Sequence, residues 1–195
     1  DATTWTFSLR PGVTWQDGST ITCEDVRHGV ARSFDPEVSS SGYALTYLDI
    51  PKESDGSSTY PGPAGKEGRS KKAQKLINEA VECPDPSTVV FHLSQPVGNF
   101  DEIVSLPEFA PVKADLAEKG AAYRAYSSGP YKLKEYVQND HVTLEKNPDY
   151  WDKGKPYLDG FRAIFMPSSS AQVAAVRSER AHIQFRGFTP KDRDT

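Results

Sequence analysis

The chain has 195 residues, of which 36% are hydrophobic and 26% are charged, and 23 lysines and arginines against 27 aspartates and glutamates give a net charge of −4. This length fits one domain or a piece of a larger protein and is enough to bury a hydrophobic core. The acidic balance argues against nucleic acid as the main partner, and the apolar runs are far shorter than the roughly 18 residues that a membrane-spanning helix needs.

The N-terminal part predicts a strand, two turns and a helix. Apolar and polar residues alternate over residues 5–9, which is the period of a half-buried strand. Pro-Gly at 11–12 and Asp-Gly at 17–18 are typical of turns. Thr22 is a favourable N-cap, and the helix that it begins is expected to end near Arg32.

Residues 33–70 are rich in Ser, Gly and Pro and predict a long loop, which is uncommon inside a compact domain and usually functional or disordered. Tyrosines within it make a disordered linker the less favoured alternative. Residues 71–81 are compatible with a helix or with the start of a strand, because a short apolar pattern does not separate the two. A turn at 84–87 and β-branched residues at 89–93 predict a hairpin.

The second half of the chain continues with the same mixture of elements. It predicts short helices over 99–104, capped by Asn99, and over 112–119, ended by Gly120, strands over 131–137, 141–146, 158–165 and 182–185, and a helix capped by Ser170. The strands 131–137 and 141–146 are expected to form a hairpin. Together the elements predict an α/β fold of the mixed α+β kind.

The sequence predicts no enzyme, no metal site and no cofactor. The four histidines lie far apart, and neither Cys-x-x-Cys nor His-Glu-x-x-His is present. Asp49, Glu53 and Asp55 lack the spacing of a calcium-binding loop and are interpreted as solvated. Glu24 and Asp25 are explained by capping of the first helix. No motif brings a nucleophile, a base and an oxyanion donor together.

Cys23 and Cys83 are the two cysteines of the chain. Two buried free thiols in a cytosolic protein are one interpretation. Cys23, however, begins the first predicted helix and Cys83 lies at the predicted hairpin, where a covalent link would hold loop-rich structure together. Closing so long a loop stabilises a fold by roughly 4 kcal/mol in the chain-entropy model. We therefore predict a disulfide and an oxidising, extracytoplasmic setting.

Four blocks of the sequence match a known family in the same order. They are WTFSLRPGVTWQDG at 5–18, ITCEDV at 21–26, SGPYKLKEY at 128–136, and NPDYW at 147–151 followed by KPYLDG at 155–160. Together they resemble the family 5 extracellular solute-binding proteins, the oligopeptide- and dipeptide-binding subunits of ABC importers. One block alone is a weak signal, whereas four in order over about 160 residues are specific. We interpret them as the frame of the fold rather than as ligand contacts.

The resemblance implies an incomplete lobe of the type 2 periplasmic-binding-protein kind, with residues 1–195 as part of the N-terminal lobe of a two-lobe protein and the second lobe absent. It implies the substrate-binding component of an ABC importer, which captures peptides and delivers them to permease subunits in the membrane. It also implies an extracellular or cell-surface location, with a lipid anchor to the cytoplasmic membrane outside this chain. The alternatives are another cargo, such as an oligosaccharide or a nickel chelate, and a non-transport signalling or structural role.

The candidate ligand-binding residues are two tyrosines of the long loop and a Ser-Ser-Gly segment: Tyr43, Tyr47, Ser127, Ser128 and Gly129. The resemblance implies that a peptide is held in an extended conformation by main-chain hydrogen bonds, with hydrated pockets for its side chains. Packing of the tyrosines against Phe34 or Leu48 is an equal alternative. For the two serines, a turn is the favoured interpretation.

Overall fold

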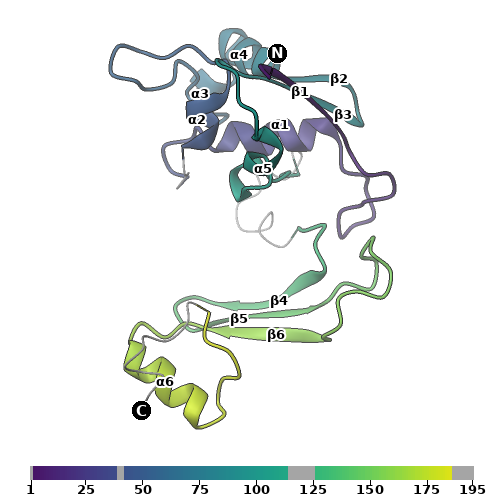
Figure 1. Cartoon of the computed structure of the whole chain (residues 1–195), viewed down its shortest axis with the longest axis vertical. Coiled ribbons are helices and arrows are strands. Elements are labelled where there is room, and N and C mark those ends of the chain that lie inside the picture. Colours follow the sequence, from purple (N-terminus) through teal and green to yellow (C-terminus); the bar gives the residue numbers. More distant parts are fainter. Residues whose placement is uncertain (1, 39–41, 114–125, 186–195) are drawn as a thin grey trace. The chain divides into compact units, whose positions relative to one another are not determined.

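The computed structural model describes residues 2–38, 42–113 and 126–185. Contacts divide the chain into two compact units. Unit 1 consists of residues 1–128 and 149–153, and unit 2 of residues 129–148 and 154–195. Figure 1 shows unit 1 mainly in purple to teal and unit 2 in green to yellow.

A three-stranded antiparallel sheet forms the centre of unit 1. Its strands are β1 (Thr4–Ser8), β2 (Val81–Asp85) and β3 (Thr88–His92), in the order β1-β3-β2. Trp5 lies opposite Phe91, and Phe7 lies opposite Val89. Along β3 the buried Val89 and Phe91 alternate with half-buried neighbours, as in a sheet with one face on the core. The predicted first strand and the hairpin are confirmed.

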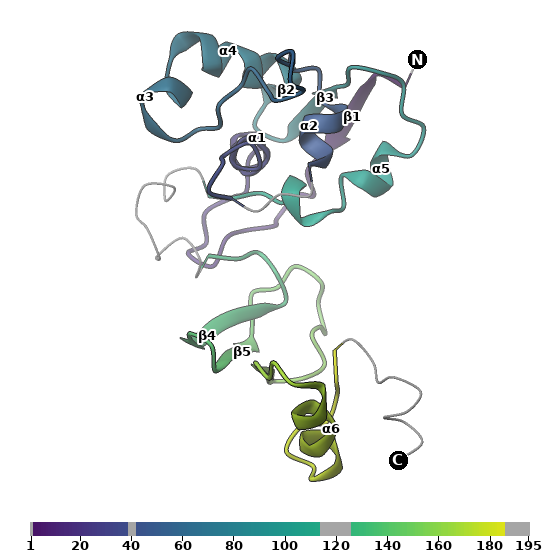
Figure 2. The ribbon, with the colours of Figure 1, turned by 90° about the vertical axis from the view of Figure 1, so that its left-hand side faces the viewer.

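Helices pack against this sheet, as Figures 1 and 2 show. They are α1 (Cys23–Arg32), α4 (Lys71–Ala80) and α5 (Phe100–Ile103), with a 3-10 turn, η1 (Pro107–Phe109). Helix α1 contacts β2 and β3, and its Val26 and Val30 are buried. The ambiguous segment 71–81 contains both predicted elements, because α4 ends at Ala80 and β2 begins at Val81.

Aromatic rings fill the core of unit 1. The rings in contact are those of Trp5, Phe7, Phe91, Phe100 and Phe109. Phe100 is fully buried, and its ring meets those of Phe91 and Phe109 edge-on at centroid distances of 5.4 and 5.7 Å. Aromatic pairs favour this geometry. These contacts hold α5 and η1 against the sheet.

The predicted loop over residues 33–70 is wrong in part. It contains two short helices, α2 (Tyr43–Tyr47) and α3 (Gly65–Gly68). Tyr60 is 1% exposed, and its ring meets that of Phe34 edge-on at 5.4 Å. A buried tyrosine therefore fixes the middle of the segment. Helices this short are stabilised by tertiary contacts, which no local pattern reveals.

Unit 2 contains a second antiparallel sheet and one helix. The sheet has the order β4-β5-β6, with β4 (Tyr131–Val137), β5 (His141–Lys146) and β6 (Gly160–Ile164), and the helix is α6 (Ser169–Arg177). Strands β4 and β5 form the predicted hairpin, with a register shift between Leu133 and Glu135. Strand β6 is shorter than the predicted 158–165.

One face of the unit 2 sheet is apolar. Two rows of cross-strand neighbours make up this apolar face: Leu133, Leu144 and Phe161, and Tyr136, Val142 and Ala163. The ring of Tyr131 meets that of Phe161 edge-on at 5.0 Å. Tyr136 and Phe161 are 51% and 44% exposed, so the described residues leave the apolar face partly open to solvent.

Two further predictions for the second half are corrected. Helix α6 is capped by Ser168, whose hydroxyl accepts a hydrogen bond from the Ala171 N–H at 3.3 Å, and not by Ser170. Residues 182–185 form no strand, because a strand needs a hydrogen-bonding partner that their pattern does not supply. Of the predicted helix 112–119, Val112 and Lys113 have no regular structure, and the remainder, with Gly120, lies outside the described residues. Among the described helices, none combines the length and the apolar content needed to cross a membrane.

Candidate functional site

Two of the predicted ligand-binding residues, Tyr43 and Tyr47, lie together on helix α2. They are one helical turn apart, and their rings stack with centroids 6.1 Å apart. Tyr43 is 39% exposed, whereas Tyr47 is half-buried and packs against the core of unit 1. Tyr47 thus packs on one side against the core, and Tyr43 presents an aromatic surface to solvent.

The backbone of α2 is fixed at both ends. Gly42 precedes it with a φ of 78°, the left-handed conformation that glycine adopts without strain. The Ala44 N–H donates a hydrogen bond to the carboxylate of Glu108 in η1. At the other end, the Tyr47 carbonyl accepts a hydrogen bond from the Ser94 N–H at 2.9 Å. The backbone that carries the aromatic pair is therefore already ordered, which lowers the conformational entropy cost of binding a ligand.

Ser127, Ser128 and Gly129 are half-buried where the chain passes from unit 1 to unit 2. The Gly129 carbonyl accepts a hydrogen bond from the side-chain amide of Asn147 at 2.9 Å, and the Asn147 N–H donates to the Pro130 carbonyl at 2.9 Å. Asn147 is 4% exposed. These bonds tie the chain before β4 to the chain after β5. They fix the backbone at Gly129, and the sequence offered no sign of its pairing with Asn147.

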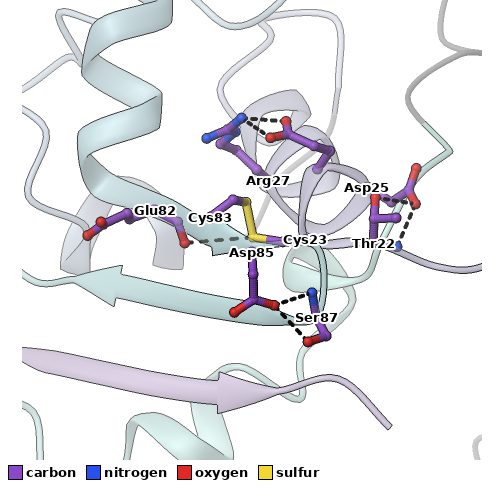
Figure 3. The surroundings of a disulfide bond; sticks show 9 residues. Thr22, Cys23, Asp25, Arg27, Glu82, Cys83, Asp85 and Ser87 are labelled. Atoms are coloured by element: carbon purple, nitrogen blue, oxygen red, sulfur yellow. Dashed lines mark hydrogen bonds and ion pairs between the residues drawn. A yellow bond between two sulfur atoms is a disulfide. The ribbon is translucent and has the colours of Figure 1, made fainter. Parts of the chain in front are cut away.

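Cys23 and Cys83 form the predicted disulfide, with Cα atoms 5.7 Å apart (Figure 3). The bond joins the first residue of α1 to β2 across 60 residues of sequence. Beside it, the carboxylate of Asp85 accepts hydrogen bonds from the hydroxyl and the backbone N–H of Ser87, both at 2.7 Å. The hydrogen bonds from Ser87 lower the pKa of Asp85. The hairpin turn is thus fixed next to the covalent link.

The carboxylate of Asp25 holds the start of α1. It accepts hydrogen bonds from the N–H and hydroxyl of Thr22 at 2.9 and 3.1 Å, and from the indole N–H of Trp15 at 3.3 Å. Thr22 is the N-cap, as predicted. Trp15 is buried, so this contact also fixes the preceding turn. Asp25 therefore links two of the resemblance blocks, and its capping interpretation is confirmed.

Two long-range contacts of unit 1 were missed by sequence reasoning. The Lys113 ammonium contacts the Asp17 carboxylate and donates a hydrogen bond to the Ser19 hydroxyl at 2.9 Å. The bond from Lys113 holds the pKa of Asp17 well below its usual range. The Arg10 guanidinium lies 4.1 Å from the ring centroid of Trp151, a cation–π contact. Both contacts join residues far apart in the chain, and no local signal marks them.

An open groove of about 940 Å³ lies beside α4 in unit 1. Its lining includes the basic Lys71 and Lys75, the acidic Asp49, Glu79 and Glu82, and the imidazole of His92. His92 Nε2 lies 3.1 Å from a carboxylate oxygen of Glu82. The groove therefore carries both signs of charge. None of the predicted ligand-binding residues lines it.

Comparisons with known proteins define the class to which this arrangement belongs. The family of bacterial extracellular solute-binding proteins, family 5 Middle, matches residues 1–193. The chain belongs to this family. The oligopeptide-binding protein OppA of Bacillus subtilis (strain 168) is 27% identical over 180 residues, which are 89% of this chain and 30% of that protein. The periplasmic oligopeptide-binding protein OppA of Salmonella typhimurium is 33% identical over 177 residues, which are 87% of this chain and 30% of that protein.

Solved structures share the fold. The clavulanic acid biosynthesis oligopeptide binding protein 2 superimposes with a TM-score of 0.77 at 28% identity, covering 99% of this chain and 34% of that one. AgaA of A. tumefaciens R10, in complex with agropinic acid, gives a TM-score of 0.67 at 28% identity, covering 92% of this chain and 31% of that one. The predicted incomplete periplasmic-binding-protein fold is confirmed. The chain spans about a third of the length of these relatives.

Proposed function

We propose that the chain is part of the substrate-binding component of an ABC importer, which captures peptides outside the cytoplasm and delivers them to permease subunits in the membrane. The observation that carries this proposal is the family match over residues 1–193, together with relatives that bind oligopeptides. In this role the protein releases its solute unchanged and is not an enzyme. Residues 1–195 are part of the N-terminal lobe, and a lipid anchor outside this chain holds the protein at the membrane.

A different small solute is the second candidate cargo. The observation that favours it is AgaA, which matches this chain at 28% identity and was solved with agropinic acid. The hydrogen bond between Trp15 and Asp25 supports a role of these two resemblance blocks as structural frame, which would serve any cargo. An oligosaccharide or a nickel chelate would fit the same frame.

Within the proposed function, Tyr43 and Tyr47 contact the peptide, and Ser127, Ser128 and Gly129 lie along it. The exposure of Tyr43 and the fixed backbone of α2 support this assignment. Aromatic side chains supply contact area at low entropic cost. The double substitution Tyr43→Ala/Tyr47→Ala in the full-length protein should weaken peptide binding about tenfold, measured by calorimetry. Tyr157→Ala is the matched control, because Tyr157 is 84% exposed; equal affinities in all three proteins would contradict the assignment.

Native mass spectrometry of the full-length protein from its own host tests the proposed cargo directly. A ladder of bound masses separated by amino-acid residues is the result expected for a broad peptide receptor. One discrete non-peptide mass would show instead that the protein carries a dedicated sugar, metal-chelate or other small solute. Turnover of a bound peptide, abolished by one substitution in this chain, would contradict the binding role itself.

A further inference from the structure

Five basic residues within ten positions form a positively charged patch on unit 1. This basic patch consists of Lys66, Arg69, Lys71, Lys72 and Lys75, all of them exposed. Glu67 is the one acidic residue of the segment 66–75. The other residues of the chain hold the remaining 18 of the 23 basic residues and 26 of the 27 acidic ones. The segment 66–75 is thus strongly basic within a chain that is acidic as a whole.

Helix α4 carries three of the basic residues of the patch, Lys71, Lys72 and Lys75. One side of the helix is buried against the core, and Lys71 and Lys75, one turn apart, lie on the opposite side. The hydroxyl of Ser70 caps the helix by accepting a hydrogen bond from the Ala73 N–H at 3.2 Å. The free N–H groups of the first turn add positive potential at the end where these lysines gather.

A tight junction fixes Lys66 and Arg69 relative to α4. A Cβ atom on Gly68 would lie 2.2 Å from the Gly62 carbonyl oxygen, so only glycine allows this approach of the two backbones. The side-chain amide of Gln74 donates a hydrogen bond to the Gly68 carbonyl at 2.8 Å. Helices α3 and α4 accordingly lie side by side in Figures 1 and 2. These contacts hold the backbone that carries the five cations against α4.

We propose that the basic patch is a docking surface for the anionic headgroups of a phospholipid bilayer. The proposal rests on the proposed function, because a protein that hands its solute to a membrane permease works at a membrane surface. Charges more than about 8 Å away are largely screened at physiological ionic strength, so the net charge of the whole chain does not cancel a local patch. Basic residues close to an anionic leaflet each add to the attraction.

Nearby acidic residues limit the strength of this contact. The Glu79 carboxylate lies 3.6 Å from the Lys75 ammonium, and Glu67 lies within the segment itself. Asp49 and Glu82 line the same groove as Lys71 and Lys75. A few cations partly offset in this way produce weak, reversible association and no anchor on their own. Such a contact orients unit 1 at the membrane while leaving it free to dissociate.

Vesicle binding by the 195-residue chain tests the proposal. Wild type should cosediment with vesicles of phosphatidylcholine containing about 30% phosphatidylglycerol at low salt and be released at about 0.5 M NaCl. The variant Lys71→Gln/Lys72→Gln/Lys75→Gln should bind about 100-fold more weakly, since each lysine contributes roughly fivefold. The matched control Lys52→Gln/Lys134→Gln/Lys153→Gln has the same net charge and alters only exposed lysines, so it should bind like wild type.

Three results would overturn the proposal. The first is binding to vesicles of phosphatidylcholine alone that is as strong as binding to vesicles with phosphatidylglycerol. The second is the same loss of binding in both triple variants. The third is binding to soluble polyphosphate without binding to vesicles. The last result would assign the patch to an anionic polymer. Circular dichroism checks that each variant is folded. The release of the wild-type chain from vesicles by salt tests the proposal without any variant. No solute is present, so failure here is distinguishable from failure of the proposed peptide binding.

Discussion

The imidazole of His141 is 5% exposed and lies among three charged groups of unit 2. Its Nε2 is 2.9 Å from the carboxylate of Glu135, its Nδ1 is 2.6 Å from that of Asp140, and the Arg162 guanidinium is 3.0 Å from Nδ1. Hydrogen bonds to Glu135 and then Asp140 raise the pKa of His141, against burial and the charge of Arg162. Glu135, His141 and Arg162 come from β4, β5 and β6, so the cluster joins all three strands.

This cluster should make unit 2 more stable in mild acid than in mild base. A histidine with a raised pKa in the folded state contributes its full stabilisation below the unfolded pKa of about 6.5 and loses it as the pH rises through the folded value. The substitution His141→Gln should therefore lower the melting temperature more at about pH 5.5 than at about pH 8.5. Thermal unfolding followed by circular dichroism at both pH values measures the difference.

His182→Gln is the control for this prediction, because His182 is exposed. It should leave the pH dependence of wild type unchanged. An effect of His141→Gln that is equal at both pH values would assign His141 a role in packing alone.

At the same scale, the sequence predicts some of the candidate site and misses the rest for a physical reason. The pairing of Cys23 with Cys83 follows from there being two cysteines and from where each lies in its predicted element. The stacking of Tyr43 on Tyr47 follows from their spacing along a helix, once the helix is known. The bond between Gly129 and Asn147 spans two strands of a hairpin and depends on register, which residue types alone do not determine.

Among the elements, the disulfide links α1 to β2 and should contribute substantially to the stability of unit 1. It closes a loop of 60 residues, so replacing both cysteines by serine should lower the free energy of unfolding by about 2–4 kcal/mol. Urea unfolding of wild type and of Cys23→Ser/Cys83→Ser measures this change. Reductant should destabilise wild type and leave the double variant unaffected.

Alkylation followed by intact-mass analysis checks the same bond without mutation. Untreated denatured protein should take up no alkyl group, and reduced protein should take up two, one for Cys23 and one for Cys83. Two reactive thiols in the untreated protein would show that the cysteines are free.

Elements defined by local alternation are the ones that the sequence predicts well. Strands β1 and β3 and the β4–β5 hairpin follow from period-2 patterns and turn residues that lie within a few positions of each other. Helices α2 and α3 do not follow from local patterns. Helix α2 is held by Glu108, which lies far along the chain, and α3 by the close approach of Gly68 to Gly62. The failed strand at 182–185 has the opposite cause, a suitable pattern for which the described residues supply no neighbouring strand.

For the whole molecule, the apolar face of the unit 2 sheet predicts self-association of the isolated 195-residue chain. Exposed apolar surface of this kind drives association or marks an interface. The average mass in sedimentation velocity should therefore rise with protein concentration. Phe161→Lys should reduce this rise, because Phe161 lies on the apolar face and is 44% exposed.

Tyr157→Lys is the matched control, since Tyr157 is 84% exposed and lies outside the strands. It adds the same charge and should leave the association of wild type intact. A monomer at all concentrations, or an equal effect of the two substitutions, would show that the apolar face does not drive association.

The division of the chain between the two units has a consequence for synthesis and for engineering. The polypeptide passes from unit 1 to unit 2 after Ser128, returns to unit 1 for residues 149–153, and then continues in unit 2 from residue 154. Trp151, in the second contribution, receives the Arg10 guanidinium on its ring. As the chain grows from its N-terminus, Arg10 therefore gains this partner only after the whole β4–β5 hairpin has been made. Neither unit is one continuous gene segment, and exchanging a unit between relatives requires three junctions instead of one.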